Sequence, residues 1–288
     1  VLLRRTEDLG VQIRCEFPVE FCQKEKEGCF SIGGRTGSIL ARRVIFSSGG
    51  LSYPSLGGNE SGWKILRELG HSMAEGFPAL VQLQVAGKRT AALKGARCRG
   101  KVTLILEDGR SACCHGEIQF TEKGLSGICI FELSRLYGEH PGQRAEILCD
   151  LMPEYSHSEI LQFLRQRTES SILPACCLLD SMLQKQVGRE ILRRVIGNSS
   201  ARAAELTGKQ LSAVARLVKE MSFSVTGTGG WETAQVTAGG VRLHQVNLET
   251  MESKVCRGVY LAGELLNIDG DCGGFNLHWA WSTGYLAG

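Results

Sequence analysis

Residues 258–288 read GVYLAGELLNIDGDCGGFNLHWAWSTGYLAG and join an apolar strand, an acidic loop, a glycine pair and the start of a helix. The run at 259–262 is short and apolar, which is typical of a strand covered on both faces. Helical spacing resumes at about Asn276. One stripe of that helix contains Leu277, Ala280, Trp281 and Gly284. Proteins of the α/β class hold an extended cofactor with a strand, a glycine-rich turn and a helix in this order.

The loop between this strand and this helix carries the groups that a cofactor needs. Its carboxylates are Glu264, Asp269 and Asp271, and its glycines are Gly270, Gly273 and Gly274. Carboxylates accept hydrogen bonds from sugar or ribityl hydroxyls, and glycines let a ligand approach the backbone. Free N–H groups at the helix start can stabilise negative charge on a phosphate or on a reduced flavin ring. The alternative is a tight strand-to-helix connection that binds no ligand.

A second strand and turn of the same design lie earlier in the chain. The buried-strand run at 43–46 ends in Ser47, Ser48, Gly49 and Gly50. An open α/β sheet places its ligand at such turns, beyond the carboxyl ends of its strands. The same region predicts short strands at 11–14, 17–23 and 28–32. It also predicts a helix over 61–69, with Asn59 or Ser61 as its cap and Gly70 as its terminator.

The middle of the chain has a different pattern. Apolar and polar residues alternate at 81–85, 101–107, 116–120 and 145–151, which predicts a small antiparallel sheet or barrel. The segment 156–221 is helical in pattern and has capping-box spacing at Ser156 with Glu159 and at Thr207 with Gln210. Its apolar stripe is formed by Leu211, Val214, Val218 and Met221. We therefore predict an α/β domain (1–77 and 223–288) interrupted by a β-barrel insert (78–152) and a helical insert (153–222).

Composition limits the classes of partner. The chain has 288 residues, 43% of them hydrophobic and 22% charged, and its 33 basic and 30 acidic residues give a net charge of +3. This balance predicts no nucleic-acid partner, because such proteins carry a large basic excess. One local exception runs from Lys88 to Lys101, where six basic residues occur without an acid. A solvated loop and strand edge is the expected explanation of that stretch.

The twelve cysteines form no C-x-x-C pair and no zinc-type Cys/His spacing, so we expect no metal site. Disulfides are unnecessary for a chain of this size, and reduced thiols predict the cytoplasm. Cys272, inside the glycine-rich loop, is expected to be a small residue tolerated beside a cofactor. No apolar run reaches the length of a membrane span, so no membrane partner is expected. The sequence leaves the oligomeric state open.

No G-x-G-x-x-G fingerprint, P-loop, H-E-x-x-H or G-x-S-x-G motif occurs in the chain. The dinucleotide fingerprint normally opens the βαβ unit of a cofactor-binding domain. Because the chain begins with Val1 rather than methionine, we expect that unit to lie upstream. The fragment by itself is then expected to bind a dinucleotide cofactor weakly or not at all and to be inactive.

Four blocks of sequence resemble the BaiN-like family of NAD(P)/FAD-dependent oxidoreductases. They occupy 237–288, 47–71 (SSGGLSYPSLGGNESGWKILRELGH), 77–84 (FPALVQLQ) and 116–127 (GEIQFTEKGLSG). The resemblance implies a Rossmann-like FAD-binding domain of the glutathione-reductase type, interrupted by a β-barrel and a helical bundle. It implies FAD as the cofactor and NAD(P)H as the reductant.

The resemblance also assigns roles to residues. Gly263 and Glu264 stand where related flavoproteins bind ribityl or ribose hydroxyls, followed by Asp269 and Gly273 in the same loop. Gly274, Phe275, Asn276 and Leu277 stand where helix-start amides meet the pyrimidine edge of the flavin. Ser47, Ser48, Gly49 and Gly50 match the turn that passes the phosphate and ribose, and Val19 matches a backbone contact for adenine. The chain departs from the usual pattern in having Ser47-Ser48 for Ala-Thr and 56–60, LGGNE, for a Thr-Gly-Ser-Thr-Gly-Asp loop.

The resulting hypothesis is hydride transfer from NAD(P)H through FAD to an unsaturated or carbonyl small molecule. The sequence identifies no catalytic residue. Tyr53, His71 and His278 have suitable chemistry, but each is expected to have a structural role. Two alternatives remain open, namely a non-catalytic module that binds a protein or RNA, and a flavin-dependent enzyme that modifies tRNA.

Overall fold

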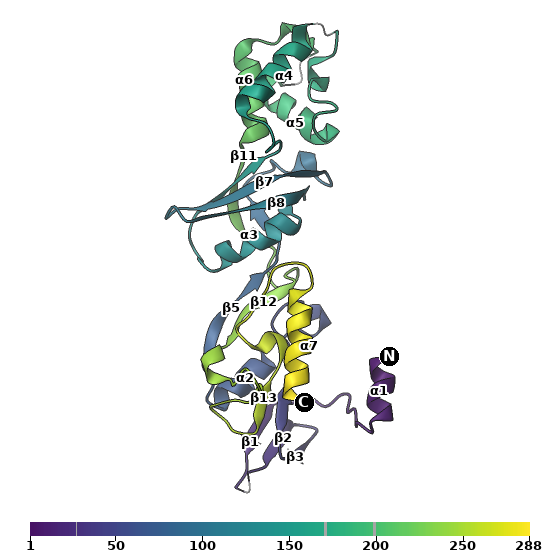
Figure 1. The fold of residues 1–288 in the computed structure, drawn as a ribbon, viewed down its shortest axis with the longest axis vertical. Helices are drawn as coiled ribbons and strands as arrows, with labels where there is room; N and C mark the ends of the chain where they lie inside the picture. The colour runs from purple at the N-terminus through teal and green to yellow at the C-terminus, as the bar shows by residue number, and fades with distance from the viewer. Residues whose placement is uncertain (27, 170–171, 198–199) are drawn as a thin grey trace.

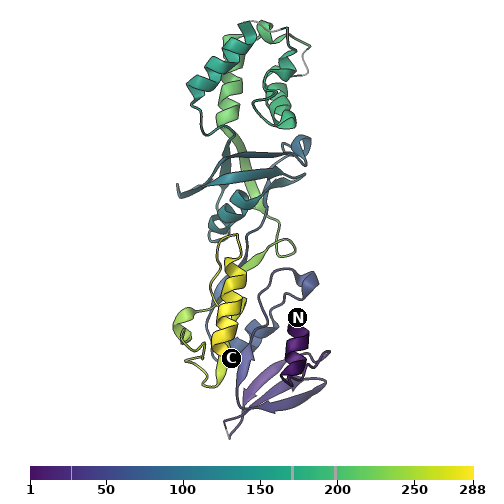
Figure 2. The same ribbon diagram turned by 45° about the vertical axis from the view of Figure 1, so that its right-hand side comes forward.

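The computed structural model describes residues 1–26, 28–169, 172–197 and 200–288. Figure 1 shows an elongated molecule with three parts along its long axis. An α/β region that contains both chain termini lies at one end, a barrel lies in the middle, and a group of helices lies at the other end. Figure 2 shows the same order after the molecule is turned.

The α/β region is built around two parallel strands, β4 (Val44–Phe46) and β13 (Val259–Leu261). These are the two strands that the sequence predicts before glycine-containing turns. Helices α2 (Ser61–Glu68) and α7 (Phe275–Ala287) follow those turns. The antiparallel sheet of β1 (Phe21–Lys24), β2 (Phe30–Gly34) and β3 (Gly37–Ala41) lies beside them. The buried core of this region includes Phe30, Trp63, Leu66, Val259, Leu261 and Leu265.

An antiparallel ribbon connects the α/β region to the barrel. It consists of β5 (Met73–Ala79) and β12 (Val236–Val241), which lie side by side in Figure 1. Every residue of β12 is buried. Gly240 has a positive φ of 121°, and a Cβ there would lie 2.5 Å from the carbonyl oxygen of Leu265. Glycine is therefore required where the ribbon passes the loop that follows β13.

The middle part is a closed six-stranded barrel, as the alternating pattern predicts. Its strands are β6 (Leu83–Val85), β7 (Arg97–Leu106), β8 (Ser111–Phe120), β9 (Gly124–Ser126), β10 (Ala145–Asp150) and β11 (Met221–Thr228). Their order around the barrel is β10-β11-β6-β9-β8-β7. In β7 the residues Val102, Leu104 and Leu106 are buried while their neighbours are more exposed, which is the period of two expected for a strand with one face inward. Helix α3 (Ile128–Gly138) packs on β8.

Three longer helices form the far end, namely α4 (His157–Glu169), α5 (Lys185–Ile196) and α6 (Gly208–Lys219). Both predicted capping boxes are present, since the side chains of Glu159 and Gln210 accept from the backbone N–H groups of Ser156 and Thr207. Short 3₁₀ turns complete the described chain. They are η1 (Pro54–Leu56), η2 (Ala91–Leu93), η3 (Ala175–Cys177), η4 (Ala203–Glu205), η5 (Leu243–Gln245) and η6 (Gly263–Leu265). No helix among the described residues has both the length and the hydropathy to cross a membrane.

Several predicted elements need correction. The segment 11–14 is not a strand, because no described strand pairs with it and its apolar residues Val11 and Ile13 are exposed. Helix α1 (Leu2–Asp8) precedes it, has no buried residue, and stands apart from the rest of the molecule in Figure 1. The strand predicted over 17–23 begins only at Phe21.

Two other elements differ in extent or orientation. Helix α6 ends at Lys219, and β11 begins at Met221. The predicted boundary at 222 falls inside β11, which pairs with β6 and so belongs to the barrel. The predicted stripe of α7 does not face the core, because Leu277 and Trp281 are 70% and 63% exposed. Apolar residues lie on all sides of α7, among its polar ones, so its periodicity does not identify the buried side.

The closed barrel predicts that a leucine inside it contributes more to stability than an exposed leucine. Replacing the fully buried Leu104 by alanine is expected to destabilise the protein by about 2–5 kcal/mol, because the transfer energy is lost and a cavity remains. The control Leu40→Ala removes the same atoms from a residue that is 74% exposed, and should change stability by less than about 0.5 kcal/mol. Urea unfolding followed by circular dichroism measures both. Equal effects of the two substitutions would contradict the assigned barrel interior.

Candidate functional site

A cavity of about 280 Å³ lies at the N-terminal end of α7. Its walls come from the loop after β13, the first turns of α7 and the β5–β12 ribbon. The lining residues are Leu80, Gln235, Val236, Glu264, Ile268, Asp271, Cys272, Gly273, Gly274, Asn276, Leu277, Trp279 and Ala280. The cavity therefore lies where the two halves of the α/β region approach the barrel.

The loop after β13 is tied to the helix that follows it. The backbone N–H of Gly263 donates to Thr283 Oγ1 at 2.9 Å, and the indole N–H of Trp279 donates to the Gly263 carbonyl at 3.2 Å. Gly263 has a positive φ of 71°, a conformation that disfavours other residues. These bonds hold the start of the loop against the inner side of α7, so Glu264 projects toward the cavity from a fixed backbone.

Glu264 and Thr237 join three segments that are distant in the sequence. The Thr237 N–H donates to the carboxylate of Glu264, and the Thr237 hydroxyl oxygen accepts from the N–H groups of Leu51 at 2.7 Å and Ser52 at 3.1 Å. A Cβ on Gly50 would overlap with the Thr237 side chain and lie 3.0 Å from the Glu264 carboxyl carbon. Glycine at position 50 is thus required by this close approach.

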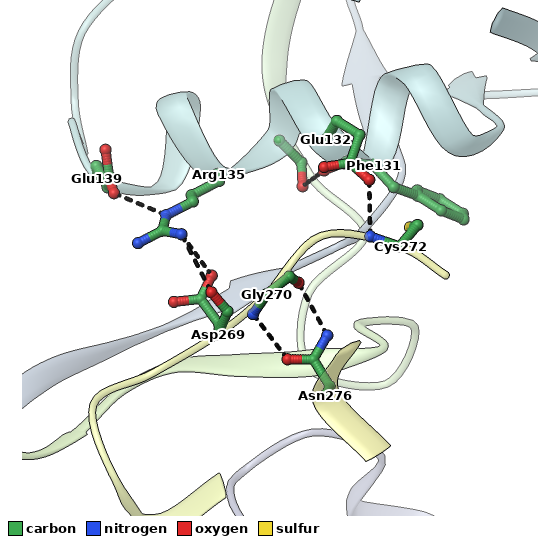
Figure 3. Close-up of polar contacts among 9 residues, drawn as sticks. Phe131, Glu132, Arg135, Glu139, Asp269, Gly270, Cys272 and Asn276 are labelled. Atoms are coloured by element: carbon green, nitrogen blue, oxygen red, sulfur yellow. Dashed lines mark hydrogen bonds and ion pairs between the residues drawn. The ribbon is translucent and has the colours of Figure 1, made fainter. Parts of the chain in front are cut away.

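The first turn of α7 has unused hydrogen-bond donors. The backbone N–H groups of Phe275, Asn276 and Leu277 donate to no residue that the structure describes. The side chain of Asn276 is instead paired with the backbone of Gly270, accepting from its N–H and donating to its carbonyl, both at 2.8 Å. This pair closes the loop over 270–276 (Figure 3). Free amides at a helix start form a region of positive potential that suits an anionic or electron-rich ligand edge.

Helix α3 of the barrel holds the other side of this loop, as Figure 3 shows. Arg135 forms an ion pair with Asp269 at 3.3 Å and is itself held by Glu139 at 3.0 Å. Glu132 accepts a hydrogen bond from the N–H of Cys272 at 2.7 Å. The side chain of Asp269 is only 7% exposed, so its charge needs this partner. The barrel insert therefore contributes directly to the shape of the cavity.

Burial and neighbouring carboxylates raise the pKa of several groups near the cavity. The pKa of Glu132 is raised by burial and by the nearby carboxylate of Asp271. Burial also raises the pKa of Asp269, although Arg135 opposes the shift. The pKa of the Cys272 thiol is raised to about 11 by burial and by Glu132. Cys272 is therefore a neutral thiol at pH 7, which is the opposite of an activated nucleophile.

A second cavity of about 330 Å³ lies between β4 and α2. Val19, Ser47 and Ser48 line it, together with apolar residues of β2, β4 and α2. A Cβ on Gly62 would overlap with the hydroxyl of Ser48, so α2 approaches the turn after β4 as closely as a glycine allows. Gly49, with a φ of 75°, turns the chain from this cavity toward Gly50.

The sequence-predicted residues thus fall into four groups. Glu264, Gly273, Gly274, Asn276 and Leu277 line the first cavity, and Val19, Ser47 and Ser48 line the second. Gly49 and Gly50 form the turn that leads from the second cavity toward Glu264, and Gly263 supports that glutamate. Asp269 and Phe275 line neither cavity. Asp269 is turned toward Arg135, and the ring of Phe275 is exposed.

The three residues considered as proton donors have structural surroundings. His71 is buried between the carbonyl of Leu66 at 3.0 Å and Ser253 Oγ at 2.7 Å, and burial lowers its pKa, so it is neutral. Tyr53 has a φ of 51° and precedes η1. His278 is an exposed residue of α7. None of the three lines the first cavity.

Sequence reasoning missed Thr237, Glu132 and Arg135. Thr237 carries a weak signal, because it opens the Thr-Ala-Gly-Gly run in a fully buried strand, where a polar residue needs partners. Glu132 and Arg135 carry none, since they lie on an ordinary helix about 140 positions from the loop that they contact. Among the described residues, no group of three or more His, Cys, Asp or Glu side chains could hold a metal ion.

Comparison with known proteins gives consistent matches. The family described as HI0933-like protein Rossmann domain matches residues 1–288. A 3-dehydro-bile acid delta(4,6)-reductase of Clostridium scindens is 36% identical over 256 residues, which cover 86% of this chain and 61% of that protein. A ribosomal RNA dihydrouridine synthase of Haemophilus influenzae is 27% identical over 269 residues, covering 93% of this chain and 64% of that protein. A ribosomal RNA dihydrouridine synthase of Escherichia coli is 25% identical over 293 residues, which cover 99% of this chain and 69% of that protein.

The raised pKa of Glu132 predicts a pH effect on stability. A carboxyl group whose pKa is raised by folding contributes most below the ordinary value of 4.5, and the contribution is lost as the pH rises through the raised pKa. Glu132→Gln keeps an oxygen for the Cys272 N–H but cannot ionise. The melting temperature of this variant relative to the unmodified protein should therefore increase as the pH rises from 4 to about 7.5.

The matched control is Glu154→Gln, which changes an exposed glutamate in the segment before α4. Its melting temperature relative to the unmodified protein should not vary with pH. If the melting temperature of Glu132→Gln relative to the unmodified protein stays constant, or falls as the pH rises, the assigned environment of Glu132 is wrong.

Proposed function

The chain belongs to the HI0933-like Rossmann-domain family, and from this we propose that it forms part of a flavin-dependent oxidoreductase. The observation that carries the proposal is the cavity at the start of α7, which Glu264 lines together with Asn276 and Leu277, whose backbone N–H groups donate to no residue that the structure describes. The chain spans 61% and 64% of the first two relatives, so the activity proposed is that of the complete protein.

The residues present fit a flavin. The amides of Asn276 and Leu277, which line the cavity, are proposed to donate to the electron-rich pyrimidine edge, and Glu264 is proposed to accept from ribityl or ribose hydroxyls. Ser47, Ser48, Gly49 and Gly50 are proposed to pass the phosphate and ribose. Val19, in the second cavity, is proposed to contact adenine. When bound, FAD supplies two-electron chemistry, accepting hydride from NAD(P)H and delivering it to an unsaturated substrate.

The protein groups around the cavity set its electrostatics. The N-terminus of α7 stabilises negative charge on the ligand edge that faces it, which raises the electron affinity of that ligand. Arg135 and Glu132 of α3 hold the loop that carries these amides, so the donors are already oriented before a ligand arrives. Leu80 and Trp279 line the cavity with apolar surface.

The names of the relatives suggest the reaction class. A delta(4,6)-reductase and a dihydrouridine synthase both describe products with fewer carbon–carbon double bonds than their substrates. We therefore propose reduction of a double bond conjugated to a carbonyl group, the unsaturated-substrate branch of the sequence hypothesis. The proposal extends to a glutathione-reductase-type topology with divisions at residues 77 and 152, while β11 (Met221–Thr228) belongs to the barrel and not to the α/β domain. It places the protein in the cytoplasm, because all twelve cysteines are free.

Two alternatives compete with this proposal. Reduction of a base in RNA is favoured by the two relatives that are named ribosomal RNA dihydrouridine synthases. It has the same flavin chemistry and differs only in the substrate. A non-catalytic module that binds a protein or RNA without a flavin is the other alternative, and it predicts a colourless protein.

The test uses the complete gene product that contains this chain. It should show flavin absorbance that NADH or NADPH bleaches. Glu264→Ala should weaken FAD binding by about 10- to 100-fold, because a hydrogen bond to a charged group contributes about 1.5–3 kcal/mol. Fluorescence titration measures the dissociation constant.

Glu249→Ala is the control, since it removes an exposed carboxylate on the loop before β13 and should leave FAD binding unchanged. Glu264→Gln keeps an acceptor for the Thr237 N–H and separates loss of the fold from loss of the ligand contact. A protein that remains colourless after incubation with FAD would rule out the proposed function.

A further inference from the structure

A basic groove lies where α5 meets the barrel, apart from the candidate flavin cavity. Two adjoining cavities, of about 430 and 600 Å³, share Glu190 and Arg193 as lining residues. One wall is the loop after β6, and the other is α5. The basic groove is defined by the cationic side chains that line these cavities, namely Lys88, Arg89, Lys185, Arg189, Arg193 and Arg194.

The two walls of the groove are fixed to each other by hydrogen bonds. The side chain of Gln186 donates to the Ala92 carbonyl at 2.8 Å, and the side chain of Arg194 donates to the Arg89 carbonyl at 2.9 Å. Leu93, in the same loop, is fully buried in the barrel core. The loop therefore has a fixed position relative to α5, and the cations of both walls meet in one space.

A buried carboxylate orients two of the arginines. The side chain of Glu190 is 6% exposed and accepts from Arg193 through two N–H groups, at 2.7 and 2.8 Å, and from Arg194 at 2.8 Å. Arg193 nevertheless keeps 55% of its side chain exposed toward solvent. One carboxylate thus holds two guanidinium groups in place before a ligand arrives, which lowers the entropy cost of binding.

The positive charges of the groove exceed its negative charges. Arg189 has Asp180 at 3.7 Å, and Glu190 serves both Arg193 and Arg194. The other three cations have exposed side chains and no carboxylate within 4.0 Å among the residues that the structure describes, and they are Lys88, Arg89 and Lys185. Six basic side chains against two carboxylates leave an excess of four positive charges.

This excess is confined to the groove. The whole chain has 33 basic and 30 acidic residues, and six of the basic and two of the acidic residues belong to the groove and its ion pairs. The rest of the chain then has 27 basic and 28 acidic residues, so it has no positive excess of its own. A long polyanion requires a continuous basic track, whereas a compact anion with about four charges is matched by the groove alone.

We propose that the basic groove binds a compact polyphosphate, in which two or three phosphate groups are linked directly. Arginine can bind a phosphate through two N–H groups, and lysine adds a point charge. The first amides of α5 add to this potential, because the N–H groups of Lys185 and Gln186 donate to no described residue. The volumes of the two cavities are also in the range of small-molecule sites.

The phosphate chain is the part of the ligand that the groove recognises. No aromatic side chain is among the described residues that line it, so it has no surface on which a nucleotide base would stack. Inorganic triphosphate and the triphosphate of a nucleotide share the chemistry that it fits.

The groove is separate from the proposed flavin chemistry. Figure 1 shows the barrel between α5 and α7, and none of the residues that line the groove lines the candidate flavin cavity. A compact ligand in the groove therefore does not contact a flavin at α7. The inference goes beyond the proposed function and does not depend on it.

Isothermal titration calorimetry on the complete gene product tests the inference, at low salt and without divalent cations. Inorganic triphosphate should bind with a dissociation constant below about 100 µM, and added salt should weaken it. ATP should bind within about threefold of inorganic triphosphate if the phosphates alone are recognised, and at least about tenfold more tightly if a nucleotide is the source. Orthophosphate should bind at least about 30-fold more weakly, because it carries fewer charges and fewer acceptors.

The variant Lys88→Gln, Arg89→Gln and Lys185→Gln removes the three unpaired cations and should weaken triphosphate binding at least about tenfold. Its melting temperature without ligand should be unchanged, since all three side chains are exposed. The matched control is Lys26→Gln, Arg43→Gln and Lys209→Gln, which removes the same charge from exposed residues outside the groove. The control should leave triphosphate affinity within about twofold.

Four results would overturn the assignment. They are no binding of triphosphate at low salt, equal weakening by the two variants, orthophosphate that binds as tightly as triphosphate, and a single-stranded RNA that binds more tightly than triphosphate at equal phosphate concentration. The last result would show that the binding surface is longer than the groove. Flavin content is measured separately, so its absence would contradict the reductase function and leave the groove assignment intact.

Discussion

The candidate site depends on the contact between Glu264 and Thr237. This contact joins the loop after β13, the buried strand β12 and, through the Thr237 hydroxyl, the turn over 51–52. The three segments can approach so closely only because position 50 has no side chain. Glu264 lines the same cavity as Asn276 and Leu277, whose backbone N–H groups donate to no described residue.

The barrel insert is part of this site and not an appendage. It leaves the α/β region through β5 and returns through β12, so it is anchored beside the cavity by an antiparallel ribbon. That anchoring brings α3 against the loop after β13, where Arg135 offsets the buried charge of Asp269 and Glu132 accepts the N–H of Cys272. Helix α3 of the barrel therefore shapes the loop after β13. This coupling gives a physical reason for inserting one domain into the other at this point.

The basic stretch from Lys88 to Lys101 is only partly neutralised by ion pairs. Lys94 pairs with Glu122, and Arg97 pairs with Glu117. Lys88 and Arg89 remain without a carboxylate partner among the described residues and join cations of α5 from about 100 positions later in the chain. Neither segment forms the groove alone. Their combination depends on the docking of α5 on the loop after β6.

The sequence by itself determined the local parts of this protein. Periodicity, and residue types that act on near neighbours, predict these parts. They are the strand, glycine turn and helix at 258–288, the strand before Ser47, the barrel strands and both capping boxes. It did not determine which side of α7 is buried, because apolar residues lie on all sides of that helix. It also could not show that Asp269 turns to Arg135, that Thr237 binds Glu264, or that α5 completes a basic groove. Those facts are contacts between segments far apart in the chain, and only the packing of the folded structure decides them.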